Sequence, residues 1–288
     1  MKLFQHKGRR CFRAAAVAVI AASLIMAGSP LMAGEPSFAE EVLTIIRAKM
    51  NERQNRRNMR KGAVLEAFFS RTEPSPEIWT MDHPSHRRRL AQFSEKLRGT
   101  PRSDTIAFGD SLLDMTRIRL RSVPDRMNFS TSGTWAHHMA RMAADIRPEL
   151  MRDGHYQSVK YVVVGSLGGN PLLMRQPVDV TITRSCAALD SIRSLYLGAR
   201  IIVFGLPPTV SLYVNMNAIP FEAALYQWVL ADRDAVLLPL QRHFAGSMGI
   251  FPRADMTVDG VHFSERGALE FDRLIERAKK APSRSVID

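Results

Sequence analysis

The stretch Val159-Lys160-Tyr161-Val162-Val163-Val164 gives the strongest strand signal in this chain and ends at Gly165. Its β-branched and aromatic residues are typical of a strand buried on both faces of a parallel sheet. Shorter apolar runs also indicate buried strands. They are Thr105 to Phe108, Ile201 to Phe204 and Ala235 to Leu238. The sequence therefore predicts four buried strands.

Helical patterns lie between these strands, for example at Ser185 to Leu197 and Glu265 to Lys279. Strands that alternate with helices at this spacing indicate right-handed βαβ units. We therefore expect an α/β fold, a three-layer α/β/α flavodoxin-like arrangement with a mostly parallel sheet, preceded by a helical N-terminal extension. Functional residues of such folds gather at the carboxyl ends of the strands.

Residues 1–33 have the pattern of an export signal. A basic start without acidic residues precedes the apolar run Ala14 to Ala27, and small residues near Ala33 offer a cleavage site. The segment is either a cleaved signal peptide or an uncleaved anchor. Arg9-Arg10-Cys11-Phe12 also resembles a twin-arginine signal. We expect a periplasmic or secreted protein.

The formal charge of +12 is concentrated near the N-terminus. Residues 34–102 carry 14 Lys and Arg against 9 Asp and Glu, whereas residues 103–288 carry 21 against 19. This balance argues against a nucleic-acid-binding core. We interpret 34–102 as a basic helical extension, 103–281 as the main domain and 282–288 as a tail.

The extension is open to two interpretations. Its periodic apolar positions between Phe38 and Phe69 indicate one or two helices, and its basic clusters lie at 53–61 and 87–89. The helices either pack on the main domain with solvated basic faces, or present a surface within 47–102 to anionic lipid headgroups or an acidic polymer.

Cysteine and histidine usage predicts neither disulfides nor metal. Cys11 lies in the export signal, which leaves Cys186 without an internal partner, and we expect it to be a buried structural thiol. No Cys/His spacing typical of metal ligands occurs, so we expect no metal and no cofactor.

Two segments near the first predicted strand carry candidate chemistry. Phe108-Gly109-Asp110-Ser111-Leu112 follows that strand directly and places Ser111 at the start of a helix, where free backbone N–H groups favour developing negative charge. Asn128-Phe129-Ser130-Thr131-Ser132-Gly133 has a turn composition, and Gly133 would let the backbone N–H approach an oxyanion.

Two further segments complete the set. Gly165-Ser166-Leu167-Gly168-Gly169-Asn170 follows the strongest strand and supplies an uncharged carboxamide donor at Asn170. In Asp259-Gly260-Val261-His262, a carboxylate three residues before a histidine can fix the tautomer of its ring. The glycines of the first of these segments lack the Lys-Ser/Thr ending of a phosphate loop.

These four segments, in this order, resemble the SGNH hydrolase family, also called GDSL lipases and esterases, over about Ser103 to Ala281. The resemblance implies that Ser111 is the nucleophile and that His262 and Asp259 complete the triad. It implies an oxyanion hole formed by Ser111, Gly133 and Asn170.

The sequence departs from the family pattern at two positions: Ser130 replaces a glycine and Pro171 replaces an Asp. Pro171 removes a backbone donor and fixes φ next to Asn170. His137 and His138 are expected in a loop or on the surface, and Trp135 in packing or in an acyl pocket.

The function implied is an exported serine esterase that acts on O-acetyl groups of glycans or on small lipid esters, without cofactor. One alternative is an O-acyltransferase or accessory protein in polysaccharide O-acetylation. Another is a non-catalytic binding member of the fold. The sequence indicates no oligomeric state.

Overall fold

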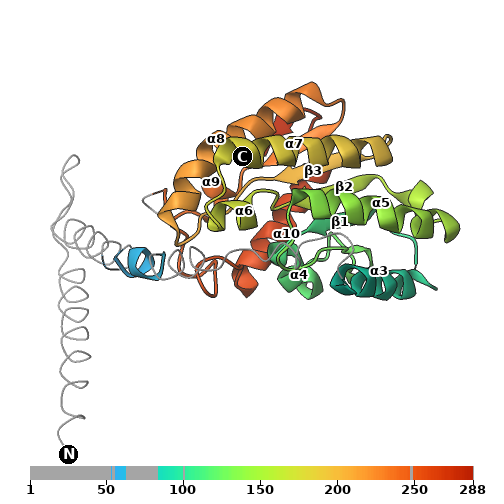
Figure 1. Cartoon of the computed structure of the whole chain (residues 1–288), viewed down its shortest axis with the longest axis horizontal. Helices are drawn as coiled ribbons and strands as arrows, with labels where there is room; N and C mark the ends of the chain where they lie inside the picture. Colours follow the sequence, from blue (N-terminus) through green and yellow to red (C-terminus); the bar gives the residue numbers. More distant parts are fainter. Residues whose placement is uncertain (1–52, 54–55, 63–83, 100, 247–248, 288) are drawn as a thin grey trace, which may run out of the picture. The chain divides into compact units, whose positions relative to one another are not determined.

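The structure is a computed structural model that describes residues 53, 56–62, 84–99, 101–246 and 249–287. The predictions for residues 1–33 fall outside this part. The chain divides into two compact units, 1–56 and 57–288, and every named helix and strand belongs to the second (Figure 1). Its elements are α3 (Pro84–Leu97), β1 (Thr105–Gly109), α4 (Ser111–Thr116), η1 (Arg117–Arg119), η2 (Asp125–Met127), α5 (Ala136–Arg152), η3 (Tyr156–Ser158), β2 (Tyr161–Gly165), α6 (Gly169–Leu173), α7 (Val178–Leu195), β3 (Arg200–Phe204), α8 (Leu212–Ala231), β4 (Ala235–Leu238), α9 (Leu240–Phe244), α10 (Glu265–Lys280) and β5 (Ser285–Val286).

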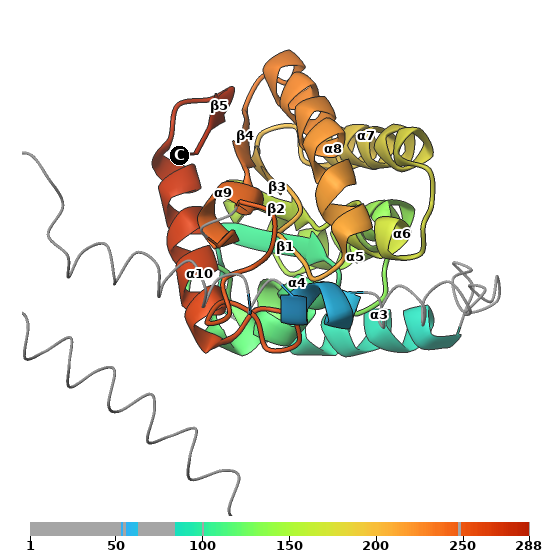
Figure 2. The same cartoon turned by 90° about the vertical axis from the view of Figure 1, so that its left-hand side faces the viewer.

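The five strands form one parallel sheet in the order β1-β2-β3-β4-β5 (Figure 2). All four predicted strands are confirmed. The fifth corrects the prediction of a tail at 282–288, because Ser285 and Val286 pair with β4 and Ile287 is buried. These residues extend the sheet by one short edge strand and belong to the domain.

A short extended segment lies on the other side of β1. Asn128 forms a parallel bridge with Ala107, and the Phe129 N–H donates to the Ala107 carbonyl at 2.8 Å. The chain therefore leaves β1 toward one neighbour and returns through α5 to β2 on the opposite side. This reversal makes the carboxyl end of β1 a topological switch point, where open α/β sheets bind their ligands.

Alternating strand residues build two apolar layers. Val162 and Val164 pack in one buried cluster, with residues of α5, α7 and α8. Val163 packs in the other, with residues of α4, α9 and α10. The two groups of helices cover opposite faces of the sheet (Figure 2). This three-layer α/β/α arrangement confirms the predicted fold class.

Helix α3 belongs to the core, so the domain begins before the predicted boundary at residue 103. Phe93 is 1% exposed and Leu97 is fully buried, and both pack in the cluster that contains α5. Residues 57–62 are helical, with most of their side chains exposed. The other residues of the 34–102 extension are only partly described. Among the helices in the described ranges, none is long and apolar enough to cross a membrane.

Cys186 differs from the expected buried thiol. It lies on α7 and is half-buried. Burial, followed by the nearby charge of Asp190, raises the pKa of its thiol, so the reactive thiolate is disfavoured. Within the part of the chain that the structure describes, no cluster of three or more His, Cys, Asp or Glu side chains could hold a metal ion.

Candidate active site

Ser111 stands at the turn from β1 into α4. Asp110 caps the helix, and its Oδ1 accepts a hydrogen bond from the Leu112 N–H at 3.0 Å. A Cβ at Gly109 would lie 2.2 Å from the Gly165 carbonyl oxygen, so only glycine lets β1 and β2 end this close together. The turn thus holds Ser111 at the carboxyl edge of the sheet, as predicted.

Asp259 and His262 form a compact loop before α10. One oxygen of Asp259 accepts from the backbone N–H groups of Val261 at 2.9 Å and His262 at 2.8 Å. The other lies 2.7 Å from Nδ1 of His262. Gly260 has φ +91°, and a Cβ there would come 2.3 Å from Cγ1 of Val210. The loop therefore depends on a glycine at 260.

The tertiary structure brings this loop to Ser111. Nε2 of His262 lies 3.0 Å from Oγ of Ser111, across 151 residues of sequence. Because an ionised carboxylate only accepts hydrogen bonds, the proton on His262 sits on Nδ1 and Nε2 is free to accept from the serine. The side chains of His262 and Asp259 are 23% and 51% exposed, so solvent reaches the site.

Asp259 and His262 stabilise each other's charged forms. Burial opposes ionisation of Asp259, but the hydrogen bonds from the side chain and backbone of His262 and from Val261 hold the pKa of Asp259 well below its usual range. The hydrogen bond to Asp259 raises the pKa of His262 against burial, and the charges of Asp259 and Asp110 add to this rise. His262 is thereby made a stronger base.

Asp110 is a further functional candidate beside the predicted triad. Its side chain is buried, and burial raises its pKa to about 6, opposed by hydrogen bonds from backbone groups, first Leu112 and then Ser166, and by the charge of His262. Asp110 and His262 line the same cavity, so a second carboxylate interacts electrostatically with the imidazole. The signal in the sequence was its position directly before Ser111.

The structure joins the other two predicted segments to the same edge. Nδ2 of Asn170 donates to the Thr134 carbonyl at 3.0 Å, and Oγ1 of Thr134 donates to the Gly109 carbonyl at 3.0 Å. The loop that contains Gly133 is thus tied to β1 and to Asn170. Pro171 lies in the first turn of α6, where a backbone N–H has no helical partner, so the departure from the family pattern is tolerated.

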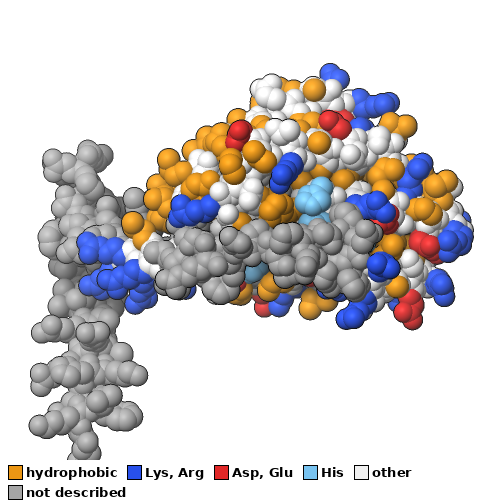
Figure 3. Space-filling view, in the orientation of Figure 1, with side chains coloured by type: hydrophobic (Ala, Val, Ile, Leu, Met, Phe, Trp, Pro, Cys, Tyr) orange, Lys and Arg blue, Asp and Glu red, His pale blue; other side chains and the backbone are white. Residues whose placement is uncertain are grey.

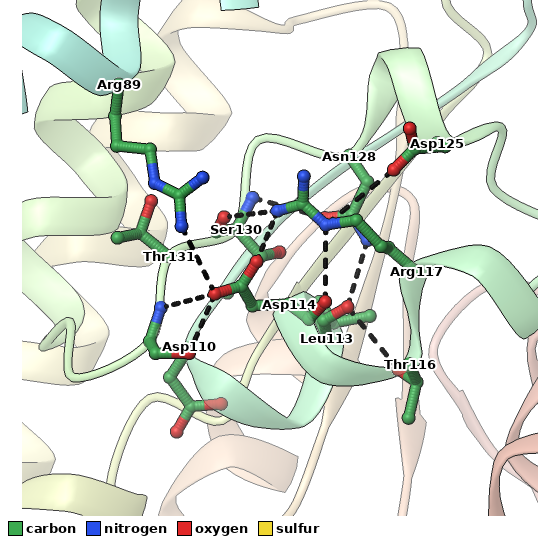
Figure 4. A network of polar contacts seen from close by, with 12 residues as sticks. Arg89, Asp110, Leu113, Asp114, Thr116, Arg117, Asp125, Asn128, Ser130 and Thr131 are labelled. Carbon is green, nitrogen blue, oxygen red and sulfur yellow. Dashed lines mark hydrogen bonds and ion pairs between the residues drawn. The ribbon is translucent and has the colours of Figure 1, made fainter. Parts of the chain in front are cut away.

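A polar network holds the Gly133 loop to α4 (Figure 4). Oδ2 of Asp114 accepts from the Ser132 N–H at 3.0 Å and from its hydroxyl at 2.7 Å. Arg117 contacts Asp114 and donates to the Ser130 carbonyl at 3.0 Å. Asn128 donates to the Leu113 carbonyl at 3.1 Å. Nothing in the sequence marked Asp114 or Arg117, because their partners lie in another segment.

Ser111, Asn170 and His262 line one cavity of about 130 Å³. Its other walls are mainly apolar and come from Leu112, Leu173, Leu206, Pro207, Val214 and Val261. An apolar cavity with a few convergent polar groups is the usual form of a small-molecule site. The space beside the serine is therefore mainly apolar.

The remaining sequence candidates lie elsewhere. His137 and His138 lie in the first turn of α5, where His137 is on the surface, as expected. His138 is instead buried, with Nδ1 accepting from the Trp135 N–H at 3.1 Å. Trp135 is buried and lines a different hollow from the cavity at Ser111. A larger, open hollow of about 760 Å³ between α5 and α7 includes His137 but none of the predicted catalytic residues.

Solved structures share this architecture. A Streptococcus pneumonia protein named for platelet activating factor aligns with a TM-score of 0.52 at 15% identity, over 67% of this chain and 90% of that one. A Bacteroides fragilis protein named as an acylhydrolase gives 0.52 at 14%, over 66% and 95%. A GDSL-like lipase from Bacteroides thetaiotaomicron gives 0.50 at 12%, over 66% and 97%.

No protein-family model and no curated protein matches the sequence. At these identities the structural likeness concerns the fold, which this chain shares with the acylhydrolase and the GDSL-like lipase. The predicted resemblance is confirmed at this level.

Proposed function

We propose that this protein is a serine hydrolase of carboxylic esters, with Ser111 as nucleophile, His262 as general base and Asp259 as the group that orients the imidazole. The observation that carries the proposal is the continuous path from Ser111 Oγ to His262 Nε2 at 3.0 Å and from His262 Nδ1 to Asp259 at 2.7 Å. Ser111, His262 and Asp259 line a mainly apolar cavity at the switch point of the sheet.

The mechanism follows from these positions. His262 takes the hydroxyl proton of Ser111 while Oγ bonds to the ester carbonyl carbon. The resulting tetrahedral intermediate then collapses, and the bond between the carbonyl carbon and the alkoxy oxygen breaks. His262 gives its proton to the leaving alcohol, and the acyl group stays on Ser111. Water, deprotonated by the same imidazole, then releases the acid and restores Ser111.

The oxyanion of each intermediate needs donors beside Ser111. We assign this role to the backbone N–H groups of Ser111 and Gly133 and to the side-chain amide of Asn170. Their support is the hydrogen-bonded link from Asn170 through Thr134 to the end of β1. Fixed donors of this kind each contribute roughly 10²–10³-fold to rate in serine hydrolases.

The cavity favours esters of short apolar acids, which include acetyl groups. An O-acetylated glycan and a small lipid ester both satisfy this requirement on the acyl side. We also propose export to the periplasm, supported by the basic start and apolar run within 1–33.

The test is hydrolysis of p-nitrophenyl esters of increasing acyl length, with Ser111→Ala as the matched control. We expect activity in the wild type, its loss in Ser111→Ala, and a preference for short chains. A fluorophosphonate probe should label the wild type at Ser111 and not the variant. Activity that survived in Ser111→Ala would refute the assigned nucleophile.

The alternative function is that of an O-acyltransferase. In that reaction a sugar hydroxyl replaces water as the acceptor of the acyl group. Product analysis with an oligosaccharide present distinguishes the two. Free acid alone supports the hydrolase, and an acylated sugar at the expense of free acid supports the transferase.

A further inference from the structure

Helix α8 has an unusual composition for a helix on the surface of a domain. Its twenty residues, Leu212–Ala231, include a single charged side chain, Glu222, which is only partly exposed. A surface helix ordinarily turns charged residues to solvent opposite its buried stripe. The outer face of α8 therefore lacks the charged residues that a solvent-facing helix ordinarily carries.

The exposed side chains of α8 form an apolar stripe along the helix. Residues spaced four and three apart share one helix face. The large ones in this stripe are Leu212 (45% exposed), Met216 (60%), Ile219 (70%), Tyr226 (37%) and Leu230 (39%). In Figure 3, hydrophobic side chains gather over the region where Figure 1 places α8. Apolar surface of this extent marks an interaction site.

This stripe begins beside the candidate active site. Val214, in the first turn of α8, lines the cavity that contains Ser111. The N–H of Val210 donates to the Gly260 carbonyl at 2.9 Å, which joins the start of α8 to the loop of Asp259. On that loop, Val258 is 65% exposed. The start of α8 and the loop of Asp259, which carries the exposed Val258, thus both border the cavity.

A basic helical turn, residues 57–62, contacts the chain just before α8. Arg57, Arg60 and Lys61 are exposed on the helix 57–62. A Cβ on Gly62 would lie 1.8 Å from the Val210 carbonyl oxygen, so the backbone of this turn contacts the segment just before α8. Three exposed cations therefore lie on a helical turn that contacts the segment just before α8.

We propose that the apolar stripe of α8 and the basic turn 57–62 together form a docking surface for an anionic lipid bilayer. An apolar helix face enters the boundary between headgroups and acyl chains, and Lys and Arg beside it attract anionic headgroups. An acidic polymer would match the cations alone and leave the stripe in water. A second copy would cover the stripe but gives no role to the three cations.

Docking in this orientation turns the rim of the Ser111 cavity toward the bilayer. If the proposed esterase activity holds, the substrate class is an acyl ester held in or at the membrane, which reaches the cavity without crossing bulk water. The docking itself requires no catalysis, so it can be tested in the inactive Ser111→Ala protein.

The direct test places an environment-sensitive fluorophore on the stripe. In the full chain with Cys11→Ser, Cys186→Ser and Ser111→Ala, Met216→Cys is labelled with nitrobenzoxadiazole. The matched control labels Met151→Cys, which is 48% exposed near the end of α5, just before the chain enters β2. With vesicles of phosphatidylglycerol and phosphatidylcholine, emission should rise and shift to the blue at 216 and not at 151. No change at 216, or equal changes at both sites, would overturn the proposal.

Charge and apolar contributions are then separated by variants of the full chain. Replacing Arg57, Arg60 and Lys61 by Gln should weaken binding to these vesicles about a hundredfold at low salt, because each cation near an anionic surface contributes about a factor of five. Met216→Glu with Ile219→Glu should also weaken it strongly, whereas Met151→Glu should not.

Soluble p-nitrophenyl acetate distinguishes this proposal from the proposed function. Met216→Glu with Ile219→Glu should hydrolyse it as the wild type does and lose activity only on vesicle-borne esters. Vesicle binding unaffected by these substitutions, or a lipid-free dimer that they dissociate, would refute the bilayer as occupant.

Discussion

The carboxylate of Asp114 holds Ser132 by two hydrogen bonds, from its backbone N–H at 3.0 Å and its hydroxyl at 2.7 Å, and Ser132 directly precedes Gly133. A residue of α4, the helix that Ser111 begins, thereby fixes the loop assigned to the oxyanion hole. The serine and the donor loop are positioned by the same short helix.

Asp114→Ala should therefore lower kcat by roughly 10- to 100-fold with little change in KM. The displaced donor would no longer stabilise the oxyanion, which develops mainly in the transition state. Steady-state kinetics on p-nitrophenyl acetate measure the split. Ser132→Ala is the matched control, since it keeps the backbone hydrogen bond, and its loss should be smaller. An unchanged kcat in folded Asp114→Ala would contradict the assigned role.

Asp110→Asn should shift the acid limb of the kcat/KM profile to lower pH. The negative charge of Asp110 contributes to the raised pKa of His262, so its removal lowers the pH at which the imidazole becomes a free base. The asparagine can still accept from the Leu112 N–H. The control is Asp190→Asn on α7, which should leave the midpoint in place. A shift to higher pH would show that the two groups are not coupled in this way.

Glu222→Gln should change how stability depends on pH. Burial, opposed by a backbone hydrogen bond from Gln241 and by the charge of Arg242, raises the pKa of Glu222 from 4.5 to about 7. Between these values the folded protein keeps a proton that the unfolded chain releases. The free energy of unfolding therefore falls as pH rises through this window, by up to about 3 kcal/mol from this group.

The glutamine variant lacks this titration. Urea denaturation at pH 5 and pH 8 should show the variant gaining stability over the wild type at pH 8, with the difference shrinking toward pH 5. A difference that is equal at both pH values would contradict the shifted pKa.

Gly260→Ala should reduce kcat/KM by disturbing the loop of Asp259 and His262. The new Cβ meets Val210 at 2.3 Å, and φ +91° is strained for any other residue. Gly249→Ala is the matched control, because φ is +70° there and the Cβ would meet nothing within 4 Å. Both substitutions place an L-residue at positive φ, which costs about 1–2 kcal/mol, but only Gly260→Ala should impair activity in the folded protein. Equal kinetics in both would refute the steric argument.

Much of the architecture was readable from local pattern. The continuous apolar runs identified β1 to β4, and the ordered segments around Ser111, Asn170 and His262 predicted where polar groups would meet. These signals are local because a buried parallel strand and a strand-to-helix turn impose their residue types on neighbours in the sequence.

Other features depended on partners distant in sequence. Ser285 and Val286 are too short a run to signal a strand, and only pairing with β4 makes them one. Phe93 and Leu97 lie in a basic segment whose composition suggested a peripheral extension, yet the apolar face of α3 completes the core.

The sequence by itself determined the alternation of strands and helices, the export-like start and the residue types at the candidate site. Only the tertiary structure decided that Asp110 shares a cavity with His262, that Asp114 fixes the Gly133 loop and that the basic turn contacts the segment just before α8. The physical reason is that propensity and periodicity act over a few residues. These contacts join groups that lie from about 18 to about 150 residues apart and exist only after the sheet has formed.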